Sequence, residues 1–313
     1  MYRAKALGKG GCQIFDAKMH ATAISRLQVE TDLRKALERH EFTLHYQPIV
    51  SLETGQVAGF ESLLRWRTSE NGLILPNQFI STAESTGLIV PIGSWVLHEA
   101  CRALKLLQEF SNLPLSISVN VSAKQFSGSD LVAEVYSALR DTGIRPDTVQ
   151  LEVTESISMD SQGAISRILS SLKAVGVRIA IDDFGTGYSS LSRLHRLQAD
   201  VLKIDRSFVS QMTRDKDNYE IVRHIIALAR SLGLRIVAEG VETEEQLKML
   251  YNLACQFGQG HLFSKPLDEA SAKVLLRAQG VMPSRSPAAQ LSLHLTEHSV
   301  GRKTEFVPWC NGD

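Results

Sequence analysis

Five apolar runs of the sequence each end in a side chain that could take part in acid–base or metal chemistry. These side chains belong to Asn120, Glu152, Asp182, Lys203 and Glu239, which follow one another at intervals of about 21 to 36 residues. Such an interval fits one strand plus one helix, the repeat of a parallel barrel in which all strands end at the same rim. We therefore expect these side chains to meet at one site, together with Glu61 from the run VAGFESLLRW.

The acidic members of this group need a counter-charge. Two like unit charges about 4 Å apart repel by roughly 4 kcal/mol at an effective dielectric constant of 20. Asp183 adds a carboxylate directly after Asp182, and this pair could bridge two ions. Oxygen ligands without histidine or cysteine suit Mg²⁺ or Mn²⁺, and two such ions serve in-line attack on a phosphodiester. The residues alone therefore indicate metal-assisted phosphate chemistry.

Glu155 has a different expected position. Side chains alternate along a strand, so Glu152 shares a face with Thr154 while Glu155 points the other way. The predicted strand ends at Asp182, which places Asp183 one residue beyond it, in the segment 183–190. We expect Glu155 to hold this segment, which we predict to be a mobile loop that positions the second metal ion.

Short β-branched runs alternate with longer amphipathic stretches between about residues 43 and 280, as in repeated βα units. The predicted strands are Thr43–Val50, Val57–Leu64, Leu115–Asn120, Val149–Thr154, Arg178–Asp182, Val201–Asp205, Arg235–Glu239 and Ala254–Gly258. Six residues between the first two strands are too few for a crossover helix, so these strands should pair as an antiparallel hairpin. The predicted fold is α/β, a TIM-like (β/α)8 barrel with an antiparallel first strand.

Helices are expected between the strands and before the first one. The predicted helices are Ile24–His40, Ile92–Leu107, Asp130–Thr142, Gly163–Val175, Asn218–Leu232 and Glu244–Leu253. Gly143, Gly176 and Gly233 favour helix ends before strands. By domain, we expect a linker or remnant over residues 1–22, a catalytic barrel over 23–280, and a flexible tail over 281–313, where prolines and serines cluster.

Composition excludes several classes of function. The 313 residues include 34 Lys and Arg against 34 Asp and Glu, so no bulk positive charge favours a nucleic-acid polymer. Cys12, Cys101, Cys255 and Cys310 are far apart and form no C-x-x-C pair, which fits a reducing cytoplasm better than a disulfide framework. No apolar run approaches the roughly 20 residues that span a bilayer, and the N-terminus lacks a signal-peptide core. We expect a cytoplasmic protein.

Seven sequence blocks resemble the signature of the EAL family of bacterial cyclic di-GMP phosphodiesterases. They are Glu61–Trp66, Asn120–Ser122, Thr154–Ser156, Asp182–Ser190, Lys203–Asp205, Ala238–Glu242 and Gln259–Gly260, and they occur in the family's order across about residues 41–280. The resemblance implies hydrolysis of cyclic di-GMP to linear 5'-pGpG with two divalent ions, Mg²⁺ or Mn²⁺. Ca²⁺ is expected to inhibit.

The same resemblance implies individual roles. Glu61, Asn120, Glu152 and Asp182 resemble ligands of the first ion, and Asp182, Asp183 and Glu239 lie at or near the second. Lys203 resembles the group that orients or deprotonates the attacking water, with Glu239 and Glu155 completing the expected catalytic set. Substrate contacts are expected from Gln47, Leu63, Arg65, Glu242, Gln259, Phe263 and Pro266.

Three positions depart from the family pattern, and the N-terminus carries a second resemblance. Ser62 replaces the family's alanine, His261 a tyrosine and Ala254 a common glycine. Met1–Gly10 looks like the last segment of a GGDEF diguanylate cyclase domain, although the GGDEF signature itself is absent. We therefore expect upstream GGDEF and sensor domains, and the family suggests a homodimer.

Simpler interpretations remain open for single residues and for the whole chain. Asn120 could cap the segment that follows it, Lys203 could belong to a buried ion pair, and Arg65 could pair with a surface acid. The chain could also be a catalytically silent cyclic di-GMP receptor or, more distantly, an enolase-like barrel lyase. The run DDFGTGYSS and the antiparallel start argue against the lyase.

Overall fold

Eight strands form a closed barrel in the computed structural model, which describes residues 29–68, 72–111, 113–155, 163–185 and 198–281. The strands are β1 (Phe42–Ser51), β2 (Val57–Thr68), β4 (Ser116–Asn120), β5 (Val149–Thr154), β6 (Arg178–Phe184), β7 (Val201–Ile204), β8 (Arg235–Ala238) and β9 (Phe257–Gly258). Their order is β1-β9-β8-β7-β6-β5-β4-β2, and β1 closes the ring by pairing with β2. The predicted TIM-like barrel is confirmed.

The first strand is antiparallel, as expected. β1 runs antiparallel to both β2 and β9, whereas every other neighbouring pair in the ring is parallel. The hairpin register places Gln47 opposite Glu61. A further short strand, β3 (Gly72–Ile74), pairs with β2 outside the ring. It was not predicted, because three residues carry no readable alternation.

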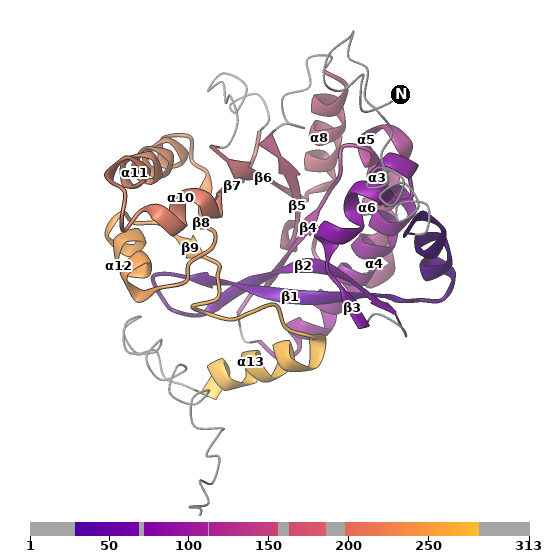
Figure 1. Cartoon of the computed structure of the whole chain (residues 1–313), viewed down its shortest axis with the longest axis horizontal. Helices are drawn as coiled ribbons and strands as arrows, with labels where there is room; N and C mark the ends of the chain where they lie inside the picture. The colour runs from indigo at the N-terminus through magenta and orange to yellow at the C-terminus, as the bar shows by residue number, and fades with distance from the viewer. Residues whose placement is uncertain (1–28, 69–71, 112, 156–162, 186–197, 282–313) are drawn as a thin grey trace, which may run out of the picture.

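Helices cover the outside of the barrel (Figure 1). They are a helix over residues 29–38, α3 (Ile80–Thr86), α4 (Ile89–Gln108), α5 (Gln125–Gly128), α6 (Leu131–Thr142), α8 (Ala164–Val175), α10 (Arg206–Gln211), α11 (Lys216–Ser231), α12 (Glu244–Asn252) and α13 (Glu269–Val281), with 3₁₀ turns η1 (Pro76–Gln78) and η2 (Pro146–Thr148). The five helices predicted between strands are present with small shifts of their ends. Gly143 and Gly176 end α6 and α8 in the left-handed conformation, at φ 68° and 103°.

Three strand predictions need correction. The strand predicted over Val57–Leu64 continues to Thr68. The strand predicted over Ala254–Gly258 starts only at Phe257, because Ala254 has φ 55° and turns the chain. The strand predicted to end at Asp182 continues to Phe184, so Asp183 lies within β6 rather than beyond it. The pairing of β6 with β7 is irregular between Ile181 and Phe184, and Asp183 has φ 53°. Asp183 therefore occupies a bulged, strained position, as often occurs beside active sites.

An apolar layer fills the barrel below the rim that carries the acidic residues. It consists of Ile49, Ala180, Val201 and Val237, packed against Phe257. Two residues further along their strands, Ala180, Val201 and Val237 are followed by Asp182, Lys203 and Glu239. Since side chains two apart on a strand share a face, the polar site rests directly on this layer.

The predicted remnant at residues 1–22 lies outside the described residues, as does the predicted tail 281–313 apart from the end of α13. Two cysteines in the described part of the chain, Cys101 and Cys255, are free and buried. None of the helices described is both long enough and apolar enough to cross a membrane.

Candidate active site

Lys203 lies at the centre of the rim, and its side chain is fully buried. Four carboxylates from different strands surround its ammonium group. Lys203 Nζ is 2.6 Å from Glu152 Oε2, 2.6 Å from Glu239 Oε1, 3.2 Å from Asp182 Oδ1 and 3.4 Å from Glu61 Oε2. The residues predicted to converge from β2, β5, β6, β7 and the end of β8 therefore do so.

Glu61 is held by two side-chain amides. Asn120 Nδ2 donates to Glu61 Oε1 at 2.8 Å, and Gln259 Nε2 donates to Glu61 Oε2 at 2.7 Å. The alternative that Asn120 caps the next helix does not hold, because the N-cap of α5 is Lys124. Asn120 is therefore part of the polar site, as its position at the end of β4 predicts.

A second group of oxygen ligands adjoins the first. Asp182, Asp183 and Glu239 each offer a carboxylate oxygen, and these oxygens lie within 4.8 Å of one another. This group shares Asp182 and Glu239 with the carboxylates around Lys203. Asp182 and Glu239 therefore belong to both groups of carboxylates.

Glu155 directly follows β5 and reaches the residue that directly follows β6. It is buried, and its Oε2 accepts a hydrogen bond of 3.1 Å from the backbone N–H of Gly185, directly after β6. The rest of the predicted loop, residues 186–190, lies outside the described residues. Gly185 belongs to the segment 183–190 that Glu155 was expected to contact, so this contact agrees with the expectation.

The pKa values indicate that the acidic site is short of positive charge. Burial raises the pKa of Glu239 to about 8, with Asp182 and Glu61 adding to the effect against the opposing charge of Lys203. Burial and the charges of Glu61 and Asp182 likewise hold the pKa of Glu152 well above its usual range. One ammonium group therefore does not balance all of the carboxylates that converge here.

Lys203 and Glu61 are shifted in the directions that favour their charged forms. Burial lowers the pKa of Lys203, but the surrounding carboxylates, Glu152 first among them, raise it more, and the result lies well above its usual range. Burial alone would raise the pKa of Glu61; Lys203 and the amides of Gln259 and Asn120 reverse this and lower it. Lys203 is therefore an ammonium donor in this arrangement.

The donor set fits hard divalent ions. All of the candidate ligand atoms are oxygens. Added positive charge would lower the raised pKa values of Glu152 and Glu239 and so stabilise their ionised forms. Gln259 Oε1 is buried and has no hydrogen-bond partner among the described residues, so it can accept from a bound group. Lys203 Nζ lies among the ligands expected for the first ion, and an ion there would share those carboxylates with it.

A cavity of about 190 Å³ opens beside this cluster. Its lining consists of Gln47, Glu61, Asp182, Arg206, Glu239, Gly240, Glu242, Gln259, Gly260 and His261. Three of the predicted substrate residues, Gln47, Glu242 and Gln259, therefore lie in its wall.

Four other predicted substrate residues, Leu63, Arg65, Phe263 and Pro266, are not among the residues that line this cavity. Leu63 and Arg65 follow Glu61 at intervals of two on β2 and so share its face. Arg65 is buried, and its Nη1 donates to the carbonyl of Leu64 at 2.8 Å. Within the described residues Arg65 forms no ion pair, which removes the alternative of a surface salt bridge.

The sequence prediction gave no site role to several residues found here, among them Arg206, Gly240 and Gln150. Arg206 begins α10, directly after the N-cap Asp205, and its Nη2 is 2.7 Å from Glu242 Oε1. Gly240 faces it with φ 67°, where a Cβ would come within 2.2 Å of Arg206 Cγ. Gln150 Nε2 donates to Ser118 Oγ at 2.9 Å and to Glu152 Oε1 at 3.3 Å. Alternation along β5 could have identified Gln150, two residues before Glu152.

The departure at Ser62 is accommodated locally. Ser62 is buried, and its Oγ donates to the carbonyl of Ser118 at 2.7 Å. A buried hydroxyl with a partner avoids the penalty of an unmet hydrogen bond. His261 lies in the wall of the 190 Å³ cavity, where a tyrosine was expected from the resemblance.

A closed barrel with acidic side chains gathered at its carboxyl-end rim is a general class of catalytic scaffold. The profile of the EAL domain family matches residues 30–266 of this chain. The chain therefore belongs to the EAL domain family.

Several relatives are similar over most of the chain. "Bifunctional diguanylate cyclase/cyclic di-GMP phosphodiesterase MucR" of Pseudomonas aeruginosa is 49% identical over 267 residues, which cover 85% of this chain and 39% of MucR. "Cyclic di-GMP phosphodiesterase NbdA" of the same organism is 42% identical over 278 residues, which cover 89% of this chain and 36% of NbdA. The chain thus spans well under half the length of these relatives.

Solved structures show the same likeness. The structure of the PaMucR phosphodiesterase in complex with c-di-GMP has a TM-score of 0.75 and 49% identity, and the match covers 78% of this chain and 99% of that one. The cAMP-bound form of the EAL enzyme Bd1971 has a TM-score of 0.77 and 36% identity, and the match covers 83% of this chain and 72% of that one.

Proposed function

We propose that this chain hydrolyses cyclic di-GMP to linear 5'-pGpG with the help of two divalent ions, Mg²⁺ or Mn²⁺. The observation that carries the proposal is the convergence of Glu61, Glu152, Asp182 and Glu239 on Lys203. The names of the similar proteins MucR and NbdA, and the c-di-GMP complex of PaMucR, support this substrate.

The residues divide into two ligand groups in this proposal. Glu61, Asn120, Glu152 and Asp182 would hold one ion, while Asp182, Asp183 and Glu239 would hold the other. When bound, such ions supply Lewis-acid stabilisation of the phosphoryl oxygens and lower the pKa of water. The chain's own contribution is to fix these ligands, which Asn120 and Gln259 do for Glu61 through their amides.

Lys203 orients the attacking water in this proposal. Its ammonium group is a donor held by carboxylates from several strands, so its position is fixed before substrate arrives. The family resemblance also implies a possible role in deprotonating water, but an ammonium group with a raised pKa donates rather than accepts a proton. Glu239 and Glu152 are the carboxylates closest to Lys203 Nζ.

The substrate would lie in and beside the 190 Å³ cavity. Gln47 and Gln259 form a pair in its wall, with Gln259 Nε2 donating to Gln47 Oε1 at 3.1 Å. Gln259 Oε1, which has no partner in the described part of the chain, offers an acceptor for a substrate N–H. Arg65, buried on the same face of β2 as Glu61, is suited to a phosphate oxygen. Leu63, Phe263 and Pro266 remain proposed contacts at the same rim.

The deciding experiment is product analysis. The purified chain is incubated with cyclic di-GMP and Mg²⁺ or Mn²⁺, and the products are separated by chromatography beside the Glu152→Gln variant and the exposed-acid control Glu53→Gln. Metal-dependent 5'-pGpG from the wild type and the control, but not from Glu152→Gln, supports the proposal. Saturable binding without any product would favour the silent receptor instead.

The homodimer, the upstream GGDEF and sensor domains, and the cytoplasmic location remain predictions. Sedimentation of the purified chain at several concentrations tests the dimer directly. The proposed activity does not depend on its result, because all of the proposed ligands described above come from one chain.

A further inference from the structure

A second cavity, of about 260 Å³, lies at the opposite end of the barrel, where the parallel strands begin. Its lining consists of Ile49, Ala58, Pro114, Leu115, Ser116, Arg145, Asp147, Thr148, Gln150, Arg178, Val201, Arg235, Val237 and Phe257. Arg178, Val201 and Arg235 are the first residues of β6, β7 and β8. The cavity shares no lining residue with the one beside the acidic cluster.

The charge of this lining is positive. Three arginines face a single carboxylate, and that carboxylate is already occupied by Arg145, whose Nε and Nη2 lie 3.0 and 2.7 Å from the two oxygens of Asp147. Arg178 Nη2 reaches the same Asp147 only at 3.8 Å. A further carboxylate that acts on Arg235 is Asp200, which lies outside the lining and is paired with Lys173. Among the lining residues, positive charge therefore exceeds negative charge.

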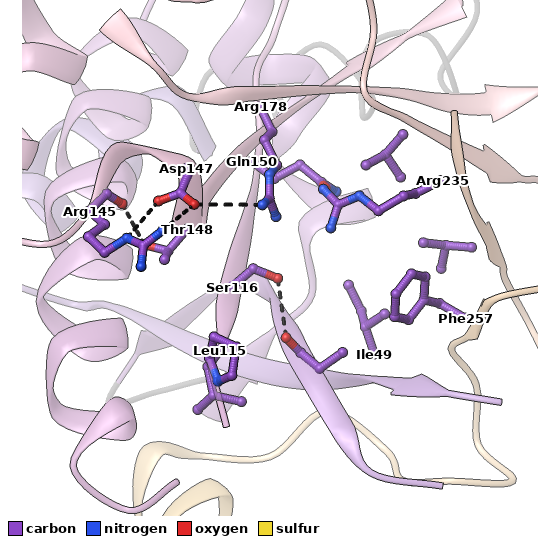
Figure 2. A pocket seen from close by; sticks show the side chains of 14 residues that line it. Ile49, Leu115, Ser116, Arg145, Asp147, Thr148, Gln150, Arg178, Arg235 and Phe257 are labelled. Atoms are coloured by element: carbon purple, nitrogen blue, oxygen red, sulfur yellow. Dashed lines mark hydrogen bonds and ion pairs between the residues drawn. The ribbon is translucent and has the colours of Figure 1, made fainter. Parts of the chain in front are cut away.

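Arg235 is the arginine of this lining with the clearest unmet hydrogen-bonding capacity. Its Nη2 is buried and has no hydrogen-bond partner among the described residues. Burial lowers the pKa of Arg235, and the neighbouring charge of Arg178 lowers it further, against the smaller opposing effect of Asp200. In Figure 2 the side chains of Arg178 and Arg235 point into the same part of the cavity, and the charge of Arg178 acts on Arg235. Two guanidinium groups that point into one cavity, with an unmet buried donor, form a receptor for an anion.

We propose that this cavity binds a small doubly charged oxyanion of the phosphate class, held between Arg178 and Arg235. Guanidinium groups match phosphate oxygens in geometry and charge, and two of them balance a dianion. Part of the remaining wall is apolar, with Val201, Val237 and Phe257 belonging to or packing against the apolar layer. The cavity thus offers room beside the anion for a small apolar group, as in a phosphate monoester.

The proposed anion site is separate from the proposed catalytic centre, but one residue of its wall forms a hydrogen bond with a catalytic carboxylate. Gln150 lies in the wall of the cavity, and its Nε2 donates to Glu152 Oε1 at 3.3 Å. Val201 and Val237 lie two residues before Lys203 and Glu239 on their strands. Gln150 therefore connects the wall of the anion cavity directly to Glu152 in the acidic cluster.

Calorimetric titration of the purified chain tests the proposal. The buffer contains EDTA, so that divalent ions do not bind phosphate, and the probes are inorganic phosphate, phenyl phosphate and benzoate. The variants are Arg178→Gln and Arg235→Gln. The controls are Arg223→Gln, an exposed arginine paired with Glu220, and Arg65→Gln at the catalytic end.

The expected result is saturable binding of at least one phosphate probe by the wild type and both controls, with benzoate weaker than phenyl phosphate. Each cavity variant should weaken binding by about 10-fold or more, the effect of losing one charge-assisted pair. Tighter binding of phenyl phosphate than of inorganic phosphate identifies an organic monoester as the ligand type; equal binding identifies free phosphate.

Two results would overturn the proposal. One is the absence of saturable binding of both phosphate probes; the other is binding that Arg65→Gln abolishes and the cavity variants leave intact, which would move the anion to the catalytic end. Circular dichroism and thermal unfolding establish that each variant is folded. If Arg235→Gln is not folded, Arg178→Gln decides alone, because this side chain is 32% exposed and easier to replace.

Discussion

Lys203 Nζ and Glu152 Oε2 form an ion pair of 2.6 Å in which neither side chain is exposed. The two residues lie on β7 and β5, which are separated in the barrel by β6. The pair therefore spans the interior of the barrel, and Asp182 from β6 lies 3.2 Å from the same ammonium group. Because a buried charge without its partner is strongly unfavourable, each member of this cluster is tied to the others.

Replacing Lys203 with Ala should lower turnover far more than affinity for cyclic di-GMP. A group that orients the attacking water acts mainly in the transition state, so kcat falls while substrate binding changes little. The measurements are steady-state kinetics with Mg²⁺ and ligand titration of the same variant. The exposed Lys105→Ala serves as the control. Weakened binding with normal turnover would make Lys203 a substrate clamp instead.

The same variant should also make stability depend on metal. Removing one partner of a buried ion pair costs about 3 to 5 kcal/mol, because the carboxylates left behind repel one another. Divalent ions bound to those carboxylates should restore part of the loss. The measurement is urea unfolding in EDTA and in Mg²⁺. A free energy of unfolding equal to that of the wild type in EDTA would contradict the central role assigned to this ammonium group.

Replacing any one of Glu61, Glu152 or Asp182 with Ala should abolish metal-dependent hydrolysis. Each change removes a proposed charged oxygen ligand, and the loss should exceed the roughly 10- to 100-fold effect of removing a group that only supports a ligand. Activity is measured across a Mg²⁺ titration, with Glu53→Ala as an exposed control. Undiminished turnover in any of the three variants would refute that residue's assignment as a ligand.

Calcium should support binding of cyclic di-GMP but little hydrolysis. Ca²⁺ accepts more ligands at longer and more variable distances than Mg²⁺, so it holds the phosphate without fixing the attacking water. Product formation and ligand binding are compared for the two ions at saturating concentrations. Equal rates with Ca²⁺ and Mg²⁺ would argue against a mechanism that depends on narrow metal geometry.

Much of the rim could be predicted because strand periodicity fixes direction. In a parallel barrel, the polar residues that end the apolar runs all lie at the same rim. Asn120, Glu152, Asp182 and Glu239 meet there. The antiparallel start followed from the short connection between β1 and β2. These features depend on local pattern and chain length, which a sequence displays.

Other features depend on contacts between distant segments. Arg206 joins the site through an ion pair with Glu242, 36 residues away, which no local pattern reveals. The irregular pairing of β6 with β7 keeps Asp183 within the strand at a positive φ, whereas periodicity predicted an ordinary strand end. The arginine pair at the other end of the barrel arises because β6 and β8 each begin with arginine, on strands separated by β7.

Glu155 provides the last prediction, because its hydrogen bond with the N–H of Gly185 identifies a backbone segment that it positions. Its carboxylate accepts from the N–H of Gly185, two residues after Asp183, and Gly185 has φ 102°. A side chain on Cβ at that position would meet the ring of Phe208 at 2.8 Å, so the backbone there is fixed by packing as well as by the hydrogen bond. Glu155 therefore holds the end of β6 on which the placement of Asp183 depends.

We expect Glu155→Ala to leave the fold and the first ligand group intact, to lower turnover by about 10-fold or more, and to weaken the response to the second ion. The reason is that Asp183, at φ 53°, occupies a strained position that costs about 1 to 3 kcal/mol and persists only while its surroundings hold it. Activity is measured across a Mg²⁺ titration beside cyclic di-GMP binding, with Glu109→Ala as an exposed control. A shift of the titration to higher Mg²⁺ with unchanged thermal stability identifies a positioning role, whereas turnover and metal dependence equal to those of the wild type would return Glu155 to an ordinary structural acid.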